Sequence, residues 1–298
     1  MTRTITIGTR GSKLALIQTQ LVAAALTELA GVTTDITTIT TKGDVNQTPI
    51  PASTVGKAWF TAEIATALTS GKIDLAVHSL KDLPPEENKE LITIAVLQRA
   101  NPRDVLVSVH GHTLKELPKG AIVGTDSIRR KACLLRLRPD LRIKSIRGNV
   151  DTRLRKLHEE EYDAIVIAAA GLERLGMLDE VASEIFSPAD CVPAPGQGVL
   201  AVQVRKSDAV LVKQMHLLQK EVVTLAVEAE QAFTRIVGGG CTQPVGCYAQ
   251  VDGSKVTLYG LVGSADATKA EYAEAQGEAT EAIPLVEQLA TQIMHKLR

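Results

Sequence analysis

Two hydrophobic periods alternate along most of the chain. Short segments such as 4–8 and 73–77 have the two-residue period of β-strands. Longer segments such as 13–30 place apolar side chains three and four residues apart, the period of an amphipathic helix. Strands and helices follow one another in this way as far as residue 237, which predicts an α/β fold.

The C-terminal part has a different pattern. Residues 245–250 and 255–262 form a predicted hairpin about Asp252-Gly253, and 271–279 adds a third strand before a closing helix. We therefore expect a small α+β region with a three-stranded antiparallel sheet. The other expected strands are 33–41, 91–97, 105–109, 121–124, 143–146, 162–169 and 199–204, and the other expected helices are 59–69, 128 onward, 150–160, 207–237 and 283–297.

Residues 42–58 fit neither period. They contain two prolines and two glycines. A segment of this length without periodicity is typical of a lid or a disordered loop.

The segment 73–85 is an apolar strand that turns abruptly polar. His78, Ser79, Lys81 and Asp82 follow the strand, and two prolines prevent any regular continuation. Strand ends are where open α/β sheets bind ligands, so Lys81 and Asp82 are candidate site residues. A surface turn with an ordinary ion pair is the alternative at this point.

Two turns share one design: strand, Gly-Thr, polar residue, serine, helix. In the first, Ser12 can cap the helix and Arg10 faces the same space, which outlines an anion site. Plain packing is the alternative. In the second, Arg129 and Arg130 open the helix after Ser127, although cations there oppose the helix dipole. Such a placement favours arginines that hold a ligand's negative groups.

Positive charge is concentrated around the second turn. Residues 129–156 hold eleven lysines and arginines against two aspartates, a local charge of +9, whereas the whole chain carries −1. We interpret Arg136, Arg138 and Arg142 as a solvated face. The other arginines follow strand ends and are expected to converge at one sheet edge: Arg129, Arg130, Arg147 and Arg153.

Arginine binds carboxylates and phosphates equally well. Because residues 129–156 contain no Phe, Tyr or Trp, the stacking surfaces of single-strand nucleic-acid binders are missing. A small, heavily carboxylated ligand fits this segment better. No metal-ligand cluster or phosphate-binding loop motif is visible.

One of the four cysteines stands out. None has CxxC spacing, so we expect thiols rather than disulfides. Most lone cysteines are buried. Cys241, however, follows three glycines after a predicted helix, where a thiol can be reached.

Length and composition bound the class. A chain of 298 residues predicts two or three domains, and 45% apolar with 22% charged residues is typical of a globular protein. The N-terminus has no apolar signal core, and the longest apolar run, 164–172, is too short to span a bilayer. We expect a cytoplasmic monomer that binds neither nucleic acid nor membrane.

Seven ordered motifs carry a family resemblance: G-T-R-G-S (8–12), D-L-A-V-H-S-L-K-D-L-P (74–84), N-P-R-D (101–104), G-T-D-S-I-R-R (124–130), I-R-G-N-V-D-T-R (146–153), P-G-Q-G (195–198) and G-G-C (239–241). Over nearly the whole chain, this set resembles the porphobilinogen deaminase (hydroxymethylbilane synthase) family.

The resemblance implies a transferase of porphyrin, tetrapyrrole and heme biosynthesis. It would condense porphobilinogen units head to tail, release ammonia and form hydroxymethylbilane. The implied cofactor is a dipyrromethane joined by a thioether to Cys241, and no metal is implied. Asp82 would be catalytic. The implied cofactor-binding residues are Lys81, Asp82, Thr125, Ser127, Arg129, Arg130, Arg147 and Cys241, and the implied substrate-binding residues are Arg10, Ser12, Arg147, Arg153 and Gln197.

The resemblance also implies three domains. Two would resemble periplasmic binding proteins, with the chain crossing back near Gln197: residues 1–99 with 198–217, and 100–197. The third, 218–298, would carry Cys241.

Several positions depart from the family pattern, among them Val55 and Ala58 in the lid segment V-G-K-A-W-F (55–60), where the usual pattern is G-G-K-G-x-F. Asp126 stands where serine is usual, and so places a negative group in a carboxylate-binding turn. Ser53 replaces a frequent lysine in the lid, and Gly238 replaces an acidic residue. The competing interpretation is a non-catalytic cytoplasmic module that senses or binds a small polycarboxylate on the same two-domain fold.

Overall fold

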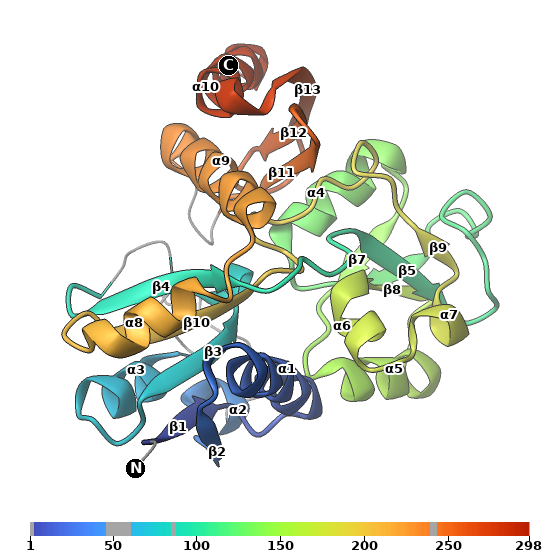
Figure 1. The fold of residues 1–298 in the computed structure, drawn as a ribbon. Coiled ribbons are helices and arrows are strands. Elements are labelled where there is room, and N and C mark those ends of the chain that lie inside the picture. The colour runs from blue at the N-terminus through green and yellow to red at the C-terminus, as the bar shows by residue number, and fades with distance from the viewer. Residues whose placement is uncertain (1–2, 46–60, 85–87, 239–242, 298) are drawn as a thin grey trace. The chain divides into compact units, whose positions relative to one another are not determined.

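The computed structural model describes residues 3–45, 61–84, 88–238 and 243–297 (Figure 1). The chain forms two compact units: Met1–Ala100 with Gly198–Thr224, called the first unit, and Asn101–Gln197 with Leu225–Arg298, called the second unit. The chain therefore leaves the first unit after Ala100 and returns at Gly198. The three-domain division stays a prediction.

The first unit contains a five-stranded sheet in the order β2-β1-β3-β10-β4. Its strands are β1 (Thr4–Thr9), β2 (Thr33–Thr38), β3 (Leu75–Ser79), β4 (Leu91–Val96) and β10 (Leu200–Arg205). β1 pairs in parallel with β2 and β3, whereas β10 pairs antiparallel with β3 and β4.

Helices cover both faces of this sheet. On one face, α1 (Lys13–Ala30) and α8 (Ala209–His216) pack on the apolar side chains of β3 and β10. On the other, α3 (Ala62–Thr69) packs around Ala76. The short α2 (Lys42–Val45) follows β2.

The second unit contains a sheet in the order β7-β6-β8-β5-β9. Its strands are β5 (Asp104–Ser108), β6 (Ile122–Gly124), β7 (Arg142–Lys144), β8 (Ala164–Ala168) and β9 (Glu184–Ile185). β6 is parallel to β7 and β8, and β5 is antiparallel to β8 and β9. α4 (Ile128–Leu137) packs with one core of the sheet, and α5 (Val150–Glu159), α6 (Ala169–Arg174) and α7 (Leu178–Val181) contribute to the other.

The two sheets share one topology. In each, three parallel strands are followed by one antiparallel strand, β10 or β5. Each antiparallel strand is the first element formed after the chain crosses into that unit. The crossing therefore brings in the strand that completes each sheet.

The glycine at the return crossing has a steric reason. Gly198 has φ +87°, and a Cβ there would collide with the carbonyl oxygen of Ala100. Its own carbonyl accepts a hydrogen bond from Ala100 N at 3.1 Å. The two crossings thus lie against each other, and only glycine fits.

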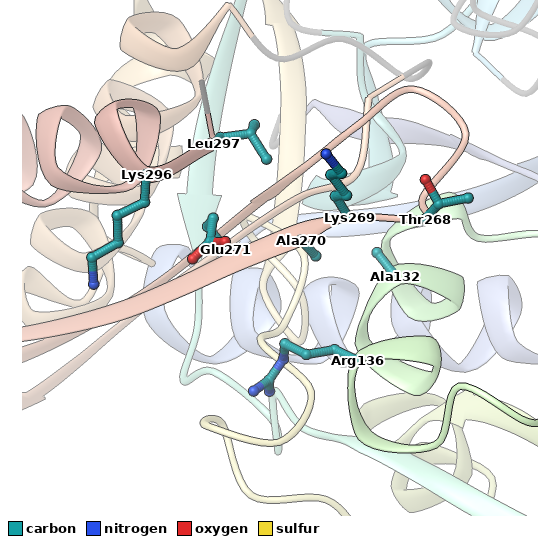
Figure 2. A pocket seen from close by; sticks show the side chains of 8 residues that line it. All are labelled: Ala132, Arg136, Thr268, Lys269, Ala270, Glu271, Lys296 and Leu297. Carbon is teal, nitrogen blue, oxygen red and sulfur yellow. The ribbon is translucent and has the colours of Figure 1, made fainter.

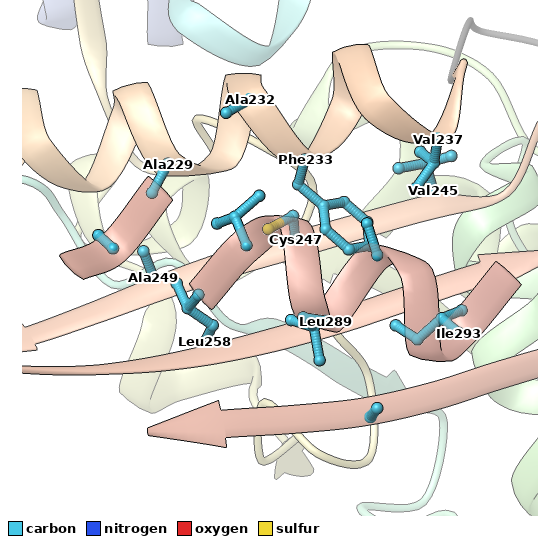
Figure 3. Packing of buried hydrophobic residues seen from close by; sticks show 14 of the residues in the cluster. Ala229, Ala232, Phe233, Val237, Val245, Cys247, Ala249, Leu258, Leu289 and Ile293 are labelled. Atoms are coloured by element: carbon cyan, nitrogen blue, oxygen red, sulfur yellow. The ribbon is translucent and has the colours of Figure 1, made fainter. Parts of the chain in front are cut away.

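The C-terminal part of the second unit is a three-stranded antiparallel sheet with two helices. Its elements are β11 (Val245–Asp252), β12 (Lys255–Gly263), β13 (Ala270–Glu278), α9 (Glu221–Val237) and α10 (Ala282–Leu297). Figure 3 shows Phe233 of α9 beside Leu289 and Ile293 of α10 and Cys247 of β11.

The α/β fold and the C-terminal antiparallel sheet are confirmed. The helical region expected over 207–237 consists of two helices, because α8 ends at His216 and α9 begins at Glu221. Leu218 is buried in the first unit's core, and its carbonyl accepts a hydrogen bond from Leu97 N at 2.8 Å. This tertiary contact interrupts a sequence of good helix formers.

Replacement of Phe233 by alanine tests the C-terminal core. Phe233 is fully buried, so Phe233→Ala should lower the free energy of unfolding by about 3–5 kcal/mol. Ile236 lies on the same helix but is 46% exposed, so Ile236→Ala should change it by less than about 1 kcal/mol. Urea denaturation measures both, and equal losses would contradict the packing in Figure 3.

Candidate active site

In the first unit, four predicted site residues follow two neighbouring strands. β1 and β3 are parallel, with Gly8 opposite Ala76. Their carboxyl ends therefore lie at the same edge and deliver Arg10 and Ser12 from one strand, and Lys81 and Asp82 from the other. Ser12 Oγ accepts a hydrogen bond from Ala15 N at 3.3 Å, which caps α1 as expected.

Asp82 is exposed at the end of a single 3₁₀ turn, Leu80–Asp82, directly after β3. Its carboxylate forms no hydrogen bond or ion pair with any residue that the structure describes. It is therefore available to a ligand.

Arg10 is bound by a carboxylate of the protein. Its Nε and Nη2 donate to Asp44 Oδ1, the former at 3.0 Å. Asp44 Oδ2 accepts from Thr41 N at 3.2 Å and Thr41 Oγ1 at 2.7 Å. Partial burial opposes the charge of Asp44, but the hydrogen bonds from Arg10 and Thr41 and the positive charge of Arg10 together outweigh it and lower the pKa of Asp44. Each carboxylate oxygen of Asp44 thus accepts two hydrogen bonds, and Asp44 orients Arg10.

His78 belongs to the same strand end, although it is not among the predicted site residues. It is buried, and its Nε2 forms no hydrogen bond within the described part of the chain. Burial, helped by the positive charge of Arg10, lowers the pKa of His78 to about 4. A neutral imidazole therefore lies beside Arg10 near physiological pH.

In the second unit, the central residue is Asp104, which the sequence did not single out. It is fully buried at the start of β5. Oδ2 accepts from Arg129 Nη1 at 2.7 Å, and Oδ1 accepts from Arg130 Nε at 3.0 Å and Nη2 at 2.8 Å. Gln197 Nε2 donates to Oδ1 at 3.0 Å. The structure thus brings three predicted site residues together around one carboxylate.

Arg129 and Arg130 are buried, and they also donate to backbone carbonyls. Arg129 Nη1 lies 2.7 Å from Val192 O, and Arg130 Nη1 lies 2.9 Å from Val166 O. Burial opposes the charge of Arg129, but Asp104, together with Cys191 and Cys133, outweighs it and raises the pKa of Arg129. Two guanidinium groups face one carboxylate, so the cluster keeps an excess positive charge. Arg129 Nε is buried without a hydrogen-bond partner among the described residues.

The remaining predicted residues surround the start of α4 and the end of β7. Thr125 Oγ1 accepts from Ser127 N at 3.1 Å, and Ser127 Oγ accepts from Arg130 N at 3.4 Å and caps α4. Arg147 Nε lies 3.0 Å from Asp126 Oδ2, and Arg153 Nε donates to Gly148 O at 2.8 Å.

The solvated face expected for three arginines is only partly correct. Arg142 is exposed. Arg138, in contrast, pairs with Asp140 and donates to Leu114 O at 2.8 Å. Arg136 donates to Ala189 O at 2.6 Å and lies 5.3 Å from the centre of the Tyr272 ring. The last two therefore fasten loops to α4.

An open pocket of about 470 Å³ lies elsewhere in the second unit (Figure 2). Arg136, Lys269, Glu271 and Lys296 provide its charged lining, and no predicted site residue contributes.

Over the described ranges, no three His, Cys, Asp or Glu side chains are grouped closely enough to hold a metal ion. Within the same ranges, no helix has the length and apolar character needed to cross a membrane. Cys133, Cys191 and Cys247 are buried, and Cys241 lies outside the described residues.

Removal of the Asp104 charge should destabilise the protein. Asp104→Asn leaves two buried guanidinium groups without their counter-charge, so the free energy of unfolding should fall by about 3–5 kcal/mol. Asp140→Asn, which removes the partner of the partly exposed Arg138, should cause a much smaller loss. Chemical denaturation compares them, and equal losses would argue against Asp104 as the central residue.

His78 predicts a pH dependence. The unfolded histidine binds a proton near pH 6.5, whereas the folded one does so near pH 4. The unfolded state therefore binds more protons between these values, and stability should fall by up to about 3 kcal/mol as pH drops through this window. His78→Gln should remove this contribution, and the exposed His295→Gln should not. If the free energy of unfolding changes with pH in the same way in wild type and in His78→Gln, His78 does not cause the pH dependence.

The chain is similar to known enzymes over most of its length. Residues 5–213 match the family model "Porphobilinogen deaminase, dipyromethane cofactor binding domain", and residues 224–295 match "Porphobilinogen deaminase, C-terminal domain". The porphobilinogen deaminase of Shouchella clausii is 50% identical over 89% of this chain and 86% of its own. That of Roseiflexus sp. (strain RS-1) is 47% identical over 89% and 88%.

Among solved structures, the methionine-binding protein MetQ has a TM-score of 0.46 and 15% identity, covering 74% of this chain and 92% of its own. An ancestral cationic amino acid solute-binding protein has a TM-score of 0.46 and 17% identity, covering 72% and 88%. The sequence matches are to enzymes and replace the interpretation as a non-catalytic binding module. The chain belongs to the porphobilinogen deaminase family.

Proposed function

We propose how residues of this chain carry out the family's reaction. The chain is a transferase that condenses porphobilinogen units head to tail, releases ammonia and forms hydroxymethylbilane, with a dipyrromethane cofactor. The observation that carries the assignment of roles is the position of Asp82: an exposed carboxylate at a strand end, without a partner among the described residues.

Asp82 acts as the catalytic carboxylate. Loss of ammonia from porphobilinogen leaves a positive charge on the substrate, and a fixed carboxylate stabilises that charge as it develops. The same group can accept the pyrrole proton. Lys81, the adjacent residue, contributes to cofactor binding.

The cations bind the acetate and propionate groups of substrate and cofactor. Arg10, Ser12, Arg147, Arg153 and Gln197 are assigned to the substrate, and Thr125, Ser127, Arg129, Arg130 and Arg147 to the cofactor. The buried orphan Arg129 Nε and the excess positive charge around Asp104 fit an anionic group. The bound cofactor supplies the pyrrole end from which the chain is extended.

Cys241 is the attachment residue, since it is the cysteine that follows three glycines. The three cysteines that the structure describes are buried, which supports this choice.

We also propose three domains, 1–99 with 198–217, 100–197 and 218–298. The separate apolar core formed by residues between 226 and 293 supports the third. Finally, we propose a cytoplasmic monomer that binds neither nucleic acid nor membrane, consistent with the net charge of −1.

Asp82→Asn tests the central assignment. The variant should fold and keep its cofactor, but lose roughly a hundred- to a thousand-fold in turnover, because Asn has the same size without the charge. Asp82→Glu should retain more activity. Ammonia release measures turnover, and intact mass should show a dipyrromethane-sized adduct in both variants that is absent in Cys241→Ser.

Two results would contradict these roles. A folded Asp82→Asn variant with turnover within about tenfold of wild type would remove Asp82 from catalysis. An active enzyme with an unmodified mass would show that Cys241 is not the attachment residue.

A further inference from the structure

Asp126 already occupies an arginine that we assign to ligand carboxylates. Asp126 follows β6 and Arg147 follows β7, and these strands are parallel neighbours, with Gly124 opposite Lys144. Asp126 Oδ2 lies 3.0 Å from Arg147 Nε, and Asp126 Oδ1 accepts a hydrogen bond from Ser145 Oγ. The contact is an ion pair rather than a hydrogen bond, so an internal carboxylate lies against the guanidinium to which we assign ligand carboxylates.

This ion pair is not what holds the two segments together. Thr125 N donates to Lys144 O at 3.0 Å, and Tyr162 OH donates to Ser145 O at 2.6 Å. The side chains of Arg147 and Asp126 are 27% and 30% exposed, so the pair itself contributes little to stability. We expect the pair to affect instead how strongly Arg147 binds another anion.

The ion pair between Arg10 and Asp44 shows the contrast. Asp44 is anchored through its second oxygen by both the backbone N and the hydroxyl of Thr41. The second oxygen of Asp126 accepts only from the Ser145 hydroxyl among the hydrogen bonds that the structure describes. Rotation of one hydroxyl therefore suffices to let Asp126 turn away, whereas Asp44 is fixed.

We propose that Asp126 is an internal competitor that sets substrate affinity: its carboxylate occupies Arg147 until a carboxylate of porphobilinogen or of the growing chain displaces it. The proposal rests on the assignment of Arg147 to substrate. Each binding event then exchanges one ion pair for another, so Arg147 contributes little net binding free energy. Such an exchange weakens binding and eases release of a polycarboxylate from a strongly basic segment.

Asp126→Asn tests the exchange, because Asn keeps the shape and the hydrogen bond to Ser145 but not the charge. If the pair has the strength of a typical partly exposed ion pair, KM for porphobilinogen should fall about two- to sixfold. We expect kcat not to rise and the melting temperature to stay the same. Asp126→Glu keeps the charge and should leave KM near that of wild type.

Two controls separate competition from general electrostatics. Glu159→Gln removes the same charge from the same unit, beside Arg155, and should leave KM unchanged. In an Arg147→Gln background, Asp126→Asn should no longer lower KM, because the effect acts through Arg147. All enzymes are compared as cofactor-loaded protein, confirmed by intact mass.

The outcomes distinguish this proposal from the one it rests on. If Arg147→Gln alone leaves KM unchanged, Arg147 does not bind substrate and both ideas fail. If Arg147→Gln raises KM but Asp126→Asn leaves it unchanged or raises it, the competitor role alone is wrong. A drop in KM that persists in the Arg147→Gln background also overturns it.

Discussion

The second unit depends on one fully buried carboxylate. Asp104 lies just after the first crossing of the chain, and Gln197, which donates to it, lies just before the second. Arg129 and Arg130 connect the same carboxylate to the start of α4, to Val166 of β8 and to the Val192 segment. Because an uncompensated buried charge costs several kcal/mol, none of these groups can move alone. The segment by which the chain enters the second unit, the segment by which it leaves, and α4 are thereby held in one arrangement.

Four arginines of the candidate site each contact a carboxylate of the protein. Arg10 contacts Asp44, Arg147 contacts Asp126, and Arg129 and Arg130 share Asp104. Without such partners, each guanidinium group could adopt many rotamers, and the neighbouring Arg129 and Arg130 would repel one another. A more deeply buried carboxylate holds its arginine more firmly. Asp104 is fully buried, whereas Asp126 is partly exposed. Each of these guanidinium groups is therefore oriented by the protein itself, which lowers the conformational entropy that it would lose on binding an anion.

Much of this could be predicted from local sequence signals. Ser12, Ser127 and the strand ends were found because a helix cap and a two-residue period involve only neighbouring residues. Asp104 was missed because its role depends on partners 25, 26 and 93 residues away. A charged residue directly before the apolar strand 105–109 was the available signal. His78 carried no sign of its burial, and the break before Glu221 is imposed by the tertiary contacts of Leu218 rather than by local propensity.

The position of β10 has a consequence for the order of folding during synthesis. β4 has one neighbour in its sheet, β10, which also separates it from β3. Residues 91–96 thus leave the ribosome with no strand to pair with until residues 200–205 follow. By then, every strand of the other five-stranded sheet has been made. The sheet of the first unit is therefore the second of the two five-stranded sheets to have all its strands made. Until then Ile94 of β4 lacks the partners β10 and α8, and its apolar side chain can be bound by chaperones or by neighbouring nascent chains.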